Sequence, residues 1–451
     1  MKPKIIIYLL VSLLAFPVQA QETENLSLST AIIYALENKI EAKQAQLQIE
    51  NSEYLIQEAR AGAFPNISAN GGITYNPILQ ETAIPTSSFP GFDTGQPFLI
   101  MQMGQKWTSV AGVSLQQNLF DQTVFTGLKA AKTTREFYRI NAELTEEQII
   151  EKVANAYYNV FIQKEQLKTI ENSYENMAQT RDVIKSLYDN GLAREIDLDR
   201  VDVQLANLAA TRLQLVNQIS INENVLKFLI GMPIEQKIHL VEDDFQVESL
   251  LLEDEINTEN RVEFRLLKKQ NELLTLQKEA TQAAYYPKLS LTASYNYLGQ
   301  GDRFPIGAGL EKGVYWSDFS AIGLNLSIPI FSGFGIKAKV NQADIQIREN
   351  EIQMKDTRLG LDLEYQNAKI QIENMYILLE DQQQNVDLAQ KVLDNTKANY
   401  RLGLATLTEL LEAENALVSA RNNYSNAVLQ FKLAEVQLLK SKGELNTLKQ
   451  E

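Results

Sequence analysis

The chain has 451 residues, with 42 Lys and Arg against 57 Asp and Glu, one His and no Cys. Its formal charge of −15 argues against a nucleic-acid-binding protein, which needs a basic face. Without Cys there can be no disulfide, thiolate metal site or Cys nucleophile, and a His-based site would depend on His239 alone. We therefore expect no catalytic residues, no metal and no cofactor.

The first residues have the pattern of an export signal. Lys2 and Lys4 precede an apolar run from Ile5 to Phe16, and small residues follow up to Ala20. This pattern is typical of a secretory signal peptide. A membrane anchor is the alternative, but the run is shorter than the ~20 residues that span a bilayer. We expect residues 1–20 to be removed and the mature protein to leave the cytoplasm.

The rest of the chain contains an internal repeat with a period of roughly 210–220 residues. Three landmarks recur in the same order: Pro65 and Pro287, Leu119-Phe120 and Ile330-Phe331, and Tyr188–Leu192 and Tyr400–Leu404. The expected domains are a first structural repeat at 21–230, an inter-repeat segment at 231–257, a second repeat at 258–440 and a C-terminal tail at 441–451. Each repeat should contain a helix, two strands, a long helix and a further helix.

Four stretches alternate apolar and other residues with a period of two, at approximately 66–76, 107–119, 288–298 and 318–330. Alternation over about ten residues with aromatic residues near the ends is typical of strands in a membrane β-barrel. A half-buried strand of a soluble sheet is the alternative. The aromatic residues expected at the membrane interface are Trp107, Trp316, Tyr75, Tyr295 and Tyr297. The longer connection, Asn76–Lys106, is rich in Pro and Gly and should be an extracellular loop.

Two long helices are expected at roughly 122–188 and 333–400, because neither stretch contains a Pro. About 67 residues at 1.5 Å each would span roughly 100 Å. Apolar residues recur every seven positions near the far ends and in the helices that follow, which indicates coiled-coil packing. Gly191 and Gly403 should end the long helices, so that each chain segment folds back as a hairpin.

Four strands per chain are too few for a membrane barrel, since about eight is the smallest known. The chain must therefore share its barrel with other copies. Two copies would supply eight strands and three copies twelve, and the strand count alone does not choose between them. The fold class expected at this point is mixed and mainly α, with an oligomeric barrel.

At these landmarks the sequence resembles the TolC-like outer membrane efflux family, the outer membrane component of tripartite export systems. The resemblance covers essentially the whole mature chain. It implies a homotrimer with a twelve-stranded barrel in the lipid of a Gram-negative outer membrane, continuous with a helical coiled-coil tunnel in the periplasm. A belt around the tunnel would include the inter-repeat segment and the C-terminal tail. The implied partners are a periplasmic adaptor (membrane fusion) protein and an inner-membrane transporter of the RND, ABC or MFS type.

The resemblance also implies roles for residues near the hairpin turns. Glu409 and Glu412 correspond to acids that ring the periplasmic entrance, where close like charges would tend to raise their pKa values. A solvated acidic face near a helix N-terminus is the alternative. Tyr400 and Asp197 correspond to residues that tie the entrance closed. The family's basic partner is replaced by Ala405, and Arg194 is a candidate to compensate. The turns themselves are candidate adaptor-docking points, at Gly191, Leu192, Gly403 and Leu404.

The expected function is passive export of drugs or other substrates through an outer membrane channel. A barrel hydrolase would need a nucleophile–base pair, which the sequence does not offer. A non-catalytic coiled-coil envelope scaffold or adhesin would explain the seven-residue repeats but not the paired strands before each long helix. The sequence does not identify the cargo.

Overall fold

The computed structural model describes residues 24–88, 95–241 and 257–450. The expected signal peptide at 1–20 lies outside the described residues. By its contacts the chain divides into two compact units. The helical unit takes its described residues from 24–49, 137–268 and 352–450, and the sheet unit consists of 50–136 and 269–351, less 89–94. Each unit therefore draws on both halves of the sequence.

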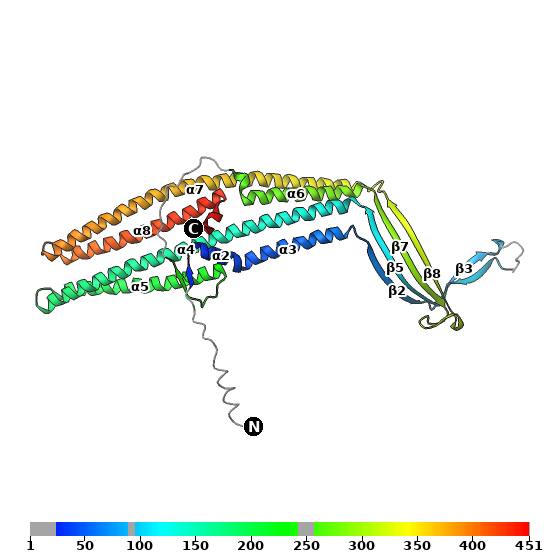
Figure 1. Ribbon diagram of the computed structural model, residues 1–451, viewed down its shortest axis with the longest axis horizontal. Helices are drawn as coiled ribbons and strands as arrows, with labels where there is room; N and C mark the ends of the chain where they lie inside the picture. Colours follow the sequence, from blue (N-terminus) through cyan, green and yellow to red (C-terminus); the bar gives the residue numbers. More distant parts are fainter. Residues whose placement is uncertain (1–23, 89–94, 242–256, 451) are drawn as a thin grey trace, which may run out of the picture. The chain divides into compact units, whose positions relative to one another are not determined.

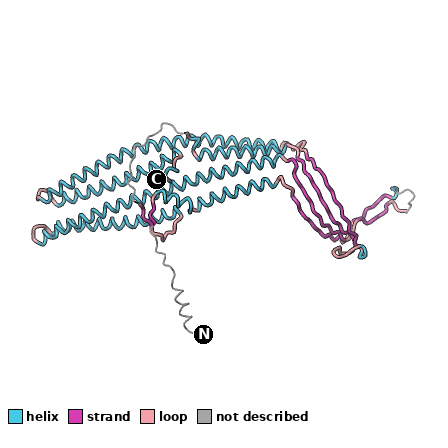
Figure 2. Tube along the Cα trace, viewed as in Figure 1, coloured by secondary structure: helices cyan, strands magenta, loops and turns pink. Residues whose placement is uncertain are grey.

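Two helices are far longer than the rest, as the absence of Pro predicted (Figures 1 and 2). Helix α4, Gln122–Asp189, has 68 residues, and helix α7, Gly335–Arg401, has 67. Each is followed by a helix of 36 residues, α5 at Glu195–Ile230 and α8 at Leu407–Lys442. The shorter helices are α2 Leu28–Asn38, α3 Ile40–Ala61 and α6 Val262–Gln282. None of the described helices combines the length and the apolar composition needed to cross a membrane.

The core of the helical unit follows the seven-residue repeats. In α4, Ile170, Met177 and Ile184 are each at most 2% exposed, and they pack with Leu410 and Leu417 of α8. Their spacing of seven keeps them on the side of α4 that faces its neighbours, as in a coiled coil. Tyr174, which lies between Ile170 and Met177 in the sequence, is 37% exposed.

The sheet unit contains an antiparallel sheet with the order β2-β5-β7-β8. Its strands are β2 Asn66–Tyr75, β5 Trp107–Phe120, β7 Lys288–Gly301 and β8 Val314–Ser327. The expected boundary of the last strand, 318–330, was wrong by several residues at both ends. Pro329 cannot donate a backbone hydrogen bond, and pairing with β7 ends two residues before it. Strands β2 and β8 form the two edges of this sheet.

The segment Asn76–Lys106 is not an irregular loop. It contains β3, Gln80–Pro85, and β4, Phe98–Met103, which pair with each other as a separate antiparallel sheet. Among the described Pro and Gly residues of this segment, Pro77 and Gly104 lie between the hairpin and the main sheet, where they interrupt the strand pairing, and Pro85 ends β3.

A small parallel sheet joins the start of the described chain to the inter-repeat segment. Strand β1, Glu24–Leu26, pairs with β6, Ile238–Leu240. The 3-10 turn Leu445–Lys449 near the C-terminus contributes buried Leu445 to the same hydrophobic core as Leu26 and Leu240. Within the helical unit, distant parts of the sequence are thus held at one place. The expected boundary of the C-terminal tail falls inside α8, which runs to Lys442.

Candidate membrane surface and hairpin turns

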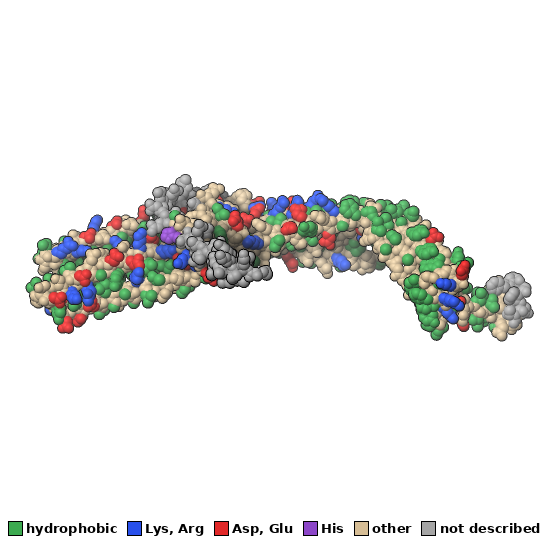
Figure 3. All heavy atoms as spheres, turned by 60° about the horizontal axis from the view of Figure 1, so that its bottom comes forward, with side chains coloured by type: hydrophobic (Ala, Val, Ile, Leu, Met, Phe, Trp, Pro, Cys, Tyr) green, Lys and Arg blue, Asp and Glu red, His purple; other side chains and the backbone are tan. Residues whose placement is uncertain are grey.

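The main sheet has one apolar face and one polar face. The strand register places the following side chains on one face: Ile67, Ala69, Ile73, Ala111, Val113, Leu115, Leu289, Leu291, Ala293, Ile322, Leu324 and Leu326. The opposite face carries mainly Ser, Thr, Asn and Gln. Ile322 is 82% exposed and Leu324 is 65% exposed, so the described residues leave this part of the apolar face uncovered. Figure 3 shows hydrophobic side chains gathered over the sheet region in one view.

The five aromatic residues predicted for a membrane interface lie toward one end of this sheet, on its apolar face. Tyr75 and Trp107 are directly paired, with ring centroids 4.6 Å apart. Tyr297 stacks on Trp316 with centroids 4.8 Å apart. The Tyr295 hydroxyl donates to Asp318 Oδ2 at 3.0 Å. The structure therefore brings the predicted residues together as two ring pairs and one nearby tyrosine.

A second aromatic group near the opposite end of the sheet was missed as a site. Phe120 and Phe125 lie 6.3 Å apart between ring centroids where β5 leads into α4. Phe331 and Phe334 lie 5.5 Å apart, edge to face, between β8 and α7. Phe331 is 76% exposed and Phe334 is 69% exposed. The sequence did contain a signal, because two of these Phe residues mark the ends of the repeated strands, but they served there only as repeat landmarks.

The two turns after the long helices have the same backbone structure. At the first, the Leu192 N–H donates to the Leu187 carbonyl at 2.7 Å; at the second, Leu404 donates to Asn399 at 2.8 Å. The Gly before each Leu has φ near +70°, a conformation that other residues rarely adopt. Leu192 and Leu404 are each 76% exposed. The turn geometry explains the two Gly residues but does not require two exposed Leu residues.

Direct contacts hold the two helical hairpins side by side near these turns (Figure 1). The Arg200 guanidinium, on α5, donates to the Thr408 hydroxyl, on α8, at 2.7 Å. The next residue of α5, Val201, is fully buried in the hydrophobic cluster that also contains Leu407. Both turns are therefore presented at the same end of the helical unit.

The three proposed gate residues are only partly connected. Arg194 binds Asp197 through two hydrogen bonds, of 3.0 and 2.9 Å, and this interaction lowers the pKa of the Asp197 carboxyl. Burial, followed by the negative charge of Asp197, raises the pKa of the Tyr400 hydroxyl. Asp197 thus lies within electrostatic range of Tyr400, and no hydrogen bond joins these two described residues. Arg194 forms its ion pair within its own hairpin and does not bridge to the second one.

Glu409 and Glu412 have different surroundings. The Glu409 carboxylate accepts hydrogen bonds from the Thr406 N–H at 2.7 Å and the Thr406 hydroxyl at 3.0 Å, while the Glu409 N–H donates to the Thr406 hydroxyl. This capping box begins α8. These bonds lower the pKa of Glu409 in the single chain, and the effect of acids from other copies stays a prediction. Glu412 is exposed on the next turn.

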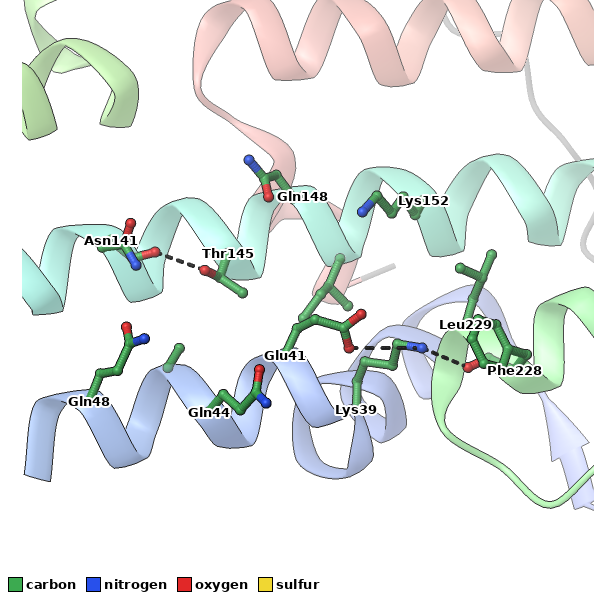
Figure 4. Close-up of a pocket in the computed structure, with 12 residues that line it drawn as sticks. Lys39, Glu41, Gln44, Gln48, Asn141, Thr145, Gln148, Lys152, Phe228 and Leu229 are labelled. Carbon is green, nitrogen blue, oxygen red and sulfur yellow. Dashed lines mark hydrogen bonds and ion pairs between the residues drawn. The ribbon is translucent and has the colours of Figure 1, made fainter.

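A pocket of about 490 Å³ lies in the helical unit between α3 and α4, near the end of α5 (Figure 4). Lys39 Nζ donates to the Phe228 carbonyl at 3.0 Å, lies 4.0 Å from the Phe228 ring centroid and is 3.8 Å from Glu41 Oε2. Lys39 therefore stabilises the C-terminal end of α5. Among the described residues, no group of three or more His, Asp or Glu side chains could hold a metal ion.

An exposed apolar sheet face in one unit, together with long helical hairpins in the other, defines a membrane protein of the outer membrane efflux class. Residues 32–232 and 259–444 match the model of the family "Outer membrane efflux protein". The chain belongs to this family, and it is a transport protein of the outer membrane.

Two relatives and one solved structure are similar to the chain. TolC of Vibrio cholerae is 22% identical over 343 residues, covering 74% of this chain and 77% of the relative. TolC of Escherichia coli is 22% identical over 347 residues, covering 74% and 69%. The crystal structure of VceC from Vibrio cholerae shares the fold with a TM-score of 0.69 at 18% identity, and the match covers 92% of this chain and 96% of VceC.

Proposed function

We propose that three copies of the chain form a passive export channel in the outer membrane. The observation that carries this proposal is a four-stranded sheet with two open edges and an exposed apolar face. Within the sheet the strands alternate in direction, so β8 of one copy can pair antiparallel with β2 of the next. Three copies would supply twelve strands with the apolar face toward lipid and the polar face toward the pore. The second aromatic group would then lie at the periplasmic interface.

The two halves of the chain are best interpreted as structural repeats. The series α3, β2, β5, α4, α5 has the same order as α6, β7, β8, α7, α8. Long helices of 68 and 67 residues and following helices of 36 residues support this interpretation. In a trimer, the repeats would place helices around one periplasmic tunnel, and the segments around β6 and the C-terminus would form a belt outside it.

The hairpin turns are the proposed docking points for a periplasmic adaptor, through which an inner-membrane transporter of the RND, ABC or MFS type would deliver cargo. Leu192 and Leu404 support this role because an exposed apolar side chain at a turn gains stability when a partner covers it. A relative from Pseudomonas aeruginosa is named as a pyoverdine export protein and another as an alkaline protease secretion protein. Both names describe export, and the exported substances differ.

Measuring the native mass of the protein extracted from isolated outer membranes in mild detergent tests this proposal. A mass of three copies, together with ion conductance in planar bilayers, is the expected result. A monomer would leave four strands that cannot close a barrel. It would favour the coiled-coil scaffold, the second candidate, although that candidate does not explain the exposed apolar sheet face.

Combining Tyr400→Phe with Asp197→Ala is expected to increase single-channel conductance in planar bilayers. Asp197 lies within electrostatic range of Tyr400. The proposal assigns to these two groups the closure of the entrance in the trimer, so removing the hydroxyl and the carboxylate should loosen it. Glu195→Ala, which removes an acid two residues from Asp197, is the matched control. Equal conductance of the double variant and the unmodified protein would remove these two residues from the gate.

Glu412→Gln is expected to reduce the preference of the channel for cations. Three copies would place three exposed Glu412 carboxylates at the entrance, and a ring of acids attracts cations. Glu412 is the better test than Glu409, whose carboxylate is needed to begin α8. The reversal potential across a bilayer with a salt gradient measures the preference. A potential equal to that of the unmodified protein would show that Glu412 does not contribute to selectivity.

A further inference from the structure

The β3–β4 hairpin leaves more apolar surface exposed than such a small element normally can. Phe98 is 52% exposed, Ile100 64% and Met101 43%, and Ile78 at the base is 89% exposed. Residues 98–103 carry no charge, and Glu81 is the single charged residue in β3. An isolated two-stranded sheet is at best marginally stable in water. Edge strands that remain uncovered usually carry charges, Lys above all, that prevent pairing with another chain. This hairpin lacks such protection, which indicates that something covers it.

The position of the hairpin beside the main sheet indicates what covers it. β3 follows directly from β2, which is an edge strand of the main sheet. At the junction, the Asn76 N–H donates to the Lys106 carbonyl at 2.7 Å, so the base of the hairpin is fixed at the end of β2 and β5. If copies join through β2 and β8, as the proposed function requires, each hairpin begins at the boundary between two copies.

The hairpin is long enough to meet its counterparts. Ten residues from Asn76 to Pro85 cover roughly 30 Å at about 3.3 Å per residue. Twelve strands spaced about 4.8 Å apart and tilted by about 40° close a barrel with a radius of roughly 12 Å. The length of the hairpin therefore exceeds the distance from the barrel wall to the barrel axis. To turn toward the barrel axis, the hairpin must bend at its base. Pro77 and Gly104 interrupt the strands there, and Gly104 has φ of +120°.

We propose that the apolar β3–β4 hairpins of neighbouring copies pack on one another and form a constriction at the outer mouth of the channel. The contact is built from residues 78–85 and 98–103 and rests on the proposed trimer. The occupant is a second copy of this chain, because copies bring identical ribbons, uncharged apart from Glu81, to one rim, and burial of Phe98, Ile100 and Met101 then stabilises the assembly.

The absence of Cys makes a cross-linking test direct. Ile100→Cys and Met101→Cys place single thiols on opposite faces of β4. In the purified trimer, a short bismaleimide should convert most of at least one variant into covalent dimers. Lys312→Cys, in the exposed turn before β8, is the matched control: it should react with a monofunctional maleimide without forming dimers.

The outcomes of the cross-linking test distinguish what covers the hairpin. Trimers whose hairpin thiols react with a water-soluble maleimide but never cross-link would overturn the contact, and thiols that do not react at all would place the hairpin in lipid instead. A protein that is not trimeric would fail at the native-mass measurement, before the hairpin is tested. As a second measurement, Phe98→Lys with Ile100→Lys should raise single-channel conductance about twofold or more, because like charges separate the hairpins and widen the mouth. Unchanged conductance in this variant would contradict the constriction.

Discussion

The Arg261→Met variant is expected to unfold with a free energy lower by about 3 kcal/mol, a large loss for a single side chain. Arg261 is 1% exposed and is the largest fully buried side chain among the described residues. Its guanidinium donates to Glu263 at 2.8 and 3.2 Å and to the Ser441 carbonyl at 2.8 Å, and lies 3.5 Å from Glu364. Methionine fills a similar volume but leaves two carboxylates and a carbonyl without their shared donor.

The loss of unfolding free energy in the Arg261→Met variant should also depend on pH. Burial, together with the nearby Glu263 and Glu143 charges, raises the pKa of Glu147 to about 6, against an ordinary 4.5. Because the folded-state pKa is the higher one, protonated Glu147 favours folding below about pH 4.5, and this contribution is lost as the pH rises through about 6. Arg261 opposes this shift. Without it, the carboxylates repel one another, so the deficit of the variant should be larger at pH 8 than at pH 5.

Urea unfolding followed by circular dichroism, in detergent at both pH values, measures this effect. Arg265→Met is the matched control, since Arg265, in the first turn of α6, pairs with Glu143 at 2.8 Å and both side chains are more than 40% exposed. Its loss should be about 0.5 kcal/mol. Equal losses for the two variants would show that burial of Arg261 does not determine its contribution.

Leu324→Arg is expected to prevent most of the protein from assembling in the outer membrane. On the lipid face of a membrane strand, an arginine costs about 2–4 kcal/mol near the middle of the bilayer, and in the proposed trimer each copy would carry one. Leu324 lies on the apolar face, opposite Leu291 of β7, and is 65% exposed.

Asn325→Arg is the control for this prediction. Asn325 is the next residue of β8, at nearly the same depth, but its side chain lies on the polar face opposite Ser290. The amount of heat-resistant oligomer in isolated outer membranes measures assembly. We expect normal amounts for Asn325→Arg and a severe reduction for Leu324→Arg. Similar amounts for both variants would contradict the assignment of the two faces.

The elements of the fold could be predicted from local patterns. Periods of two and seven identified the paired strands and the coiled-coil helices, and the absence of Pro predicted the helices of 68 and 67 residues. The β3–β4 hairpin was missed because Pro and Gly residues around its strands suggested a loop, whereas pairing between β3 and β4 joins residues from 13 positions apart (Pro85 and Phe98) to 23 positions apart (Gln80 and Met103). Strand ends were uncertain for the same reason, because the pairing of one strand ends where its partner strand ends.

For the candidate site, the sequence by itself determined which residues are present: two Gly-Leu turns, acids beyond them, and aromatic residues near strand ends. The tertiary structure decided their interactions. It brought Tyr75 of β2 to Trp107 of β5 and Arg200 of α5 to Thr408 of α8, whereas the Arg194–Asp197 pair and the Thr406–Glu409 cap are local contacts at a spacing of three residues. Spacing along one helix or strand is a local property that a sequence displays. Which groups meet across separate elements depends on the three-dimensional packing that buries Arg261 and leaves Leu324 exposed.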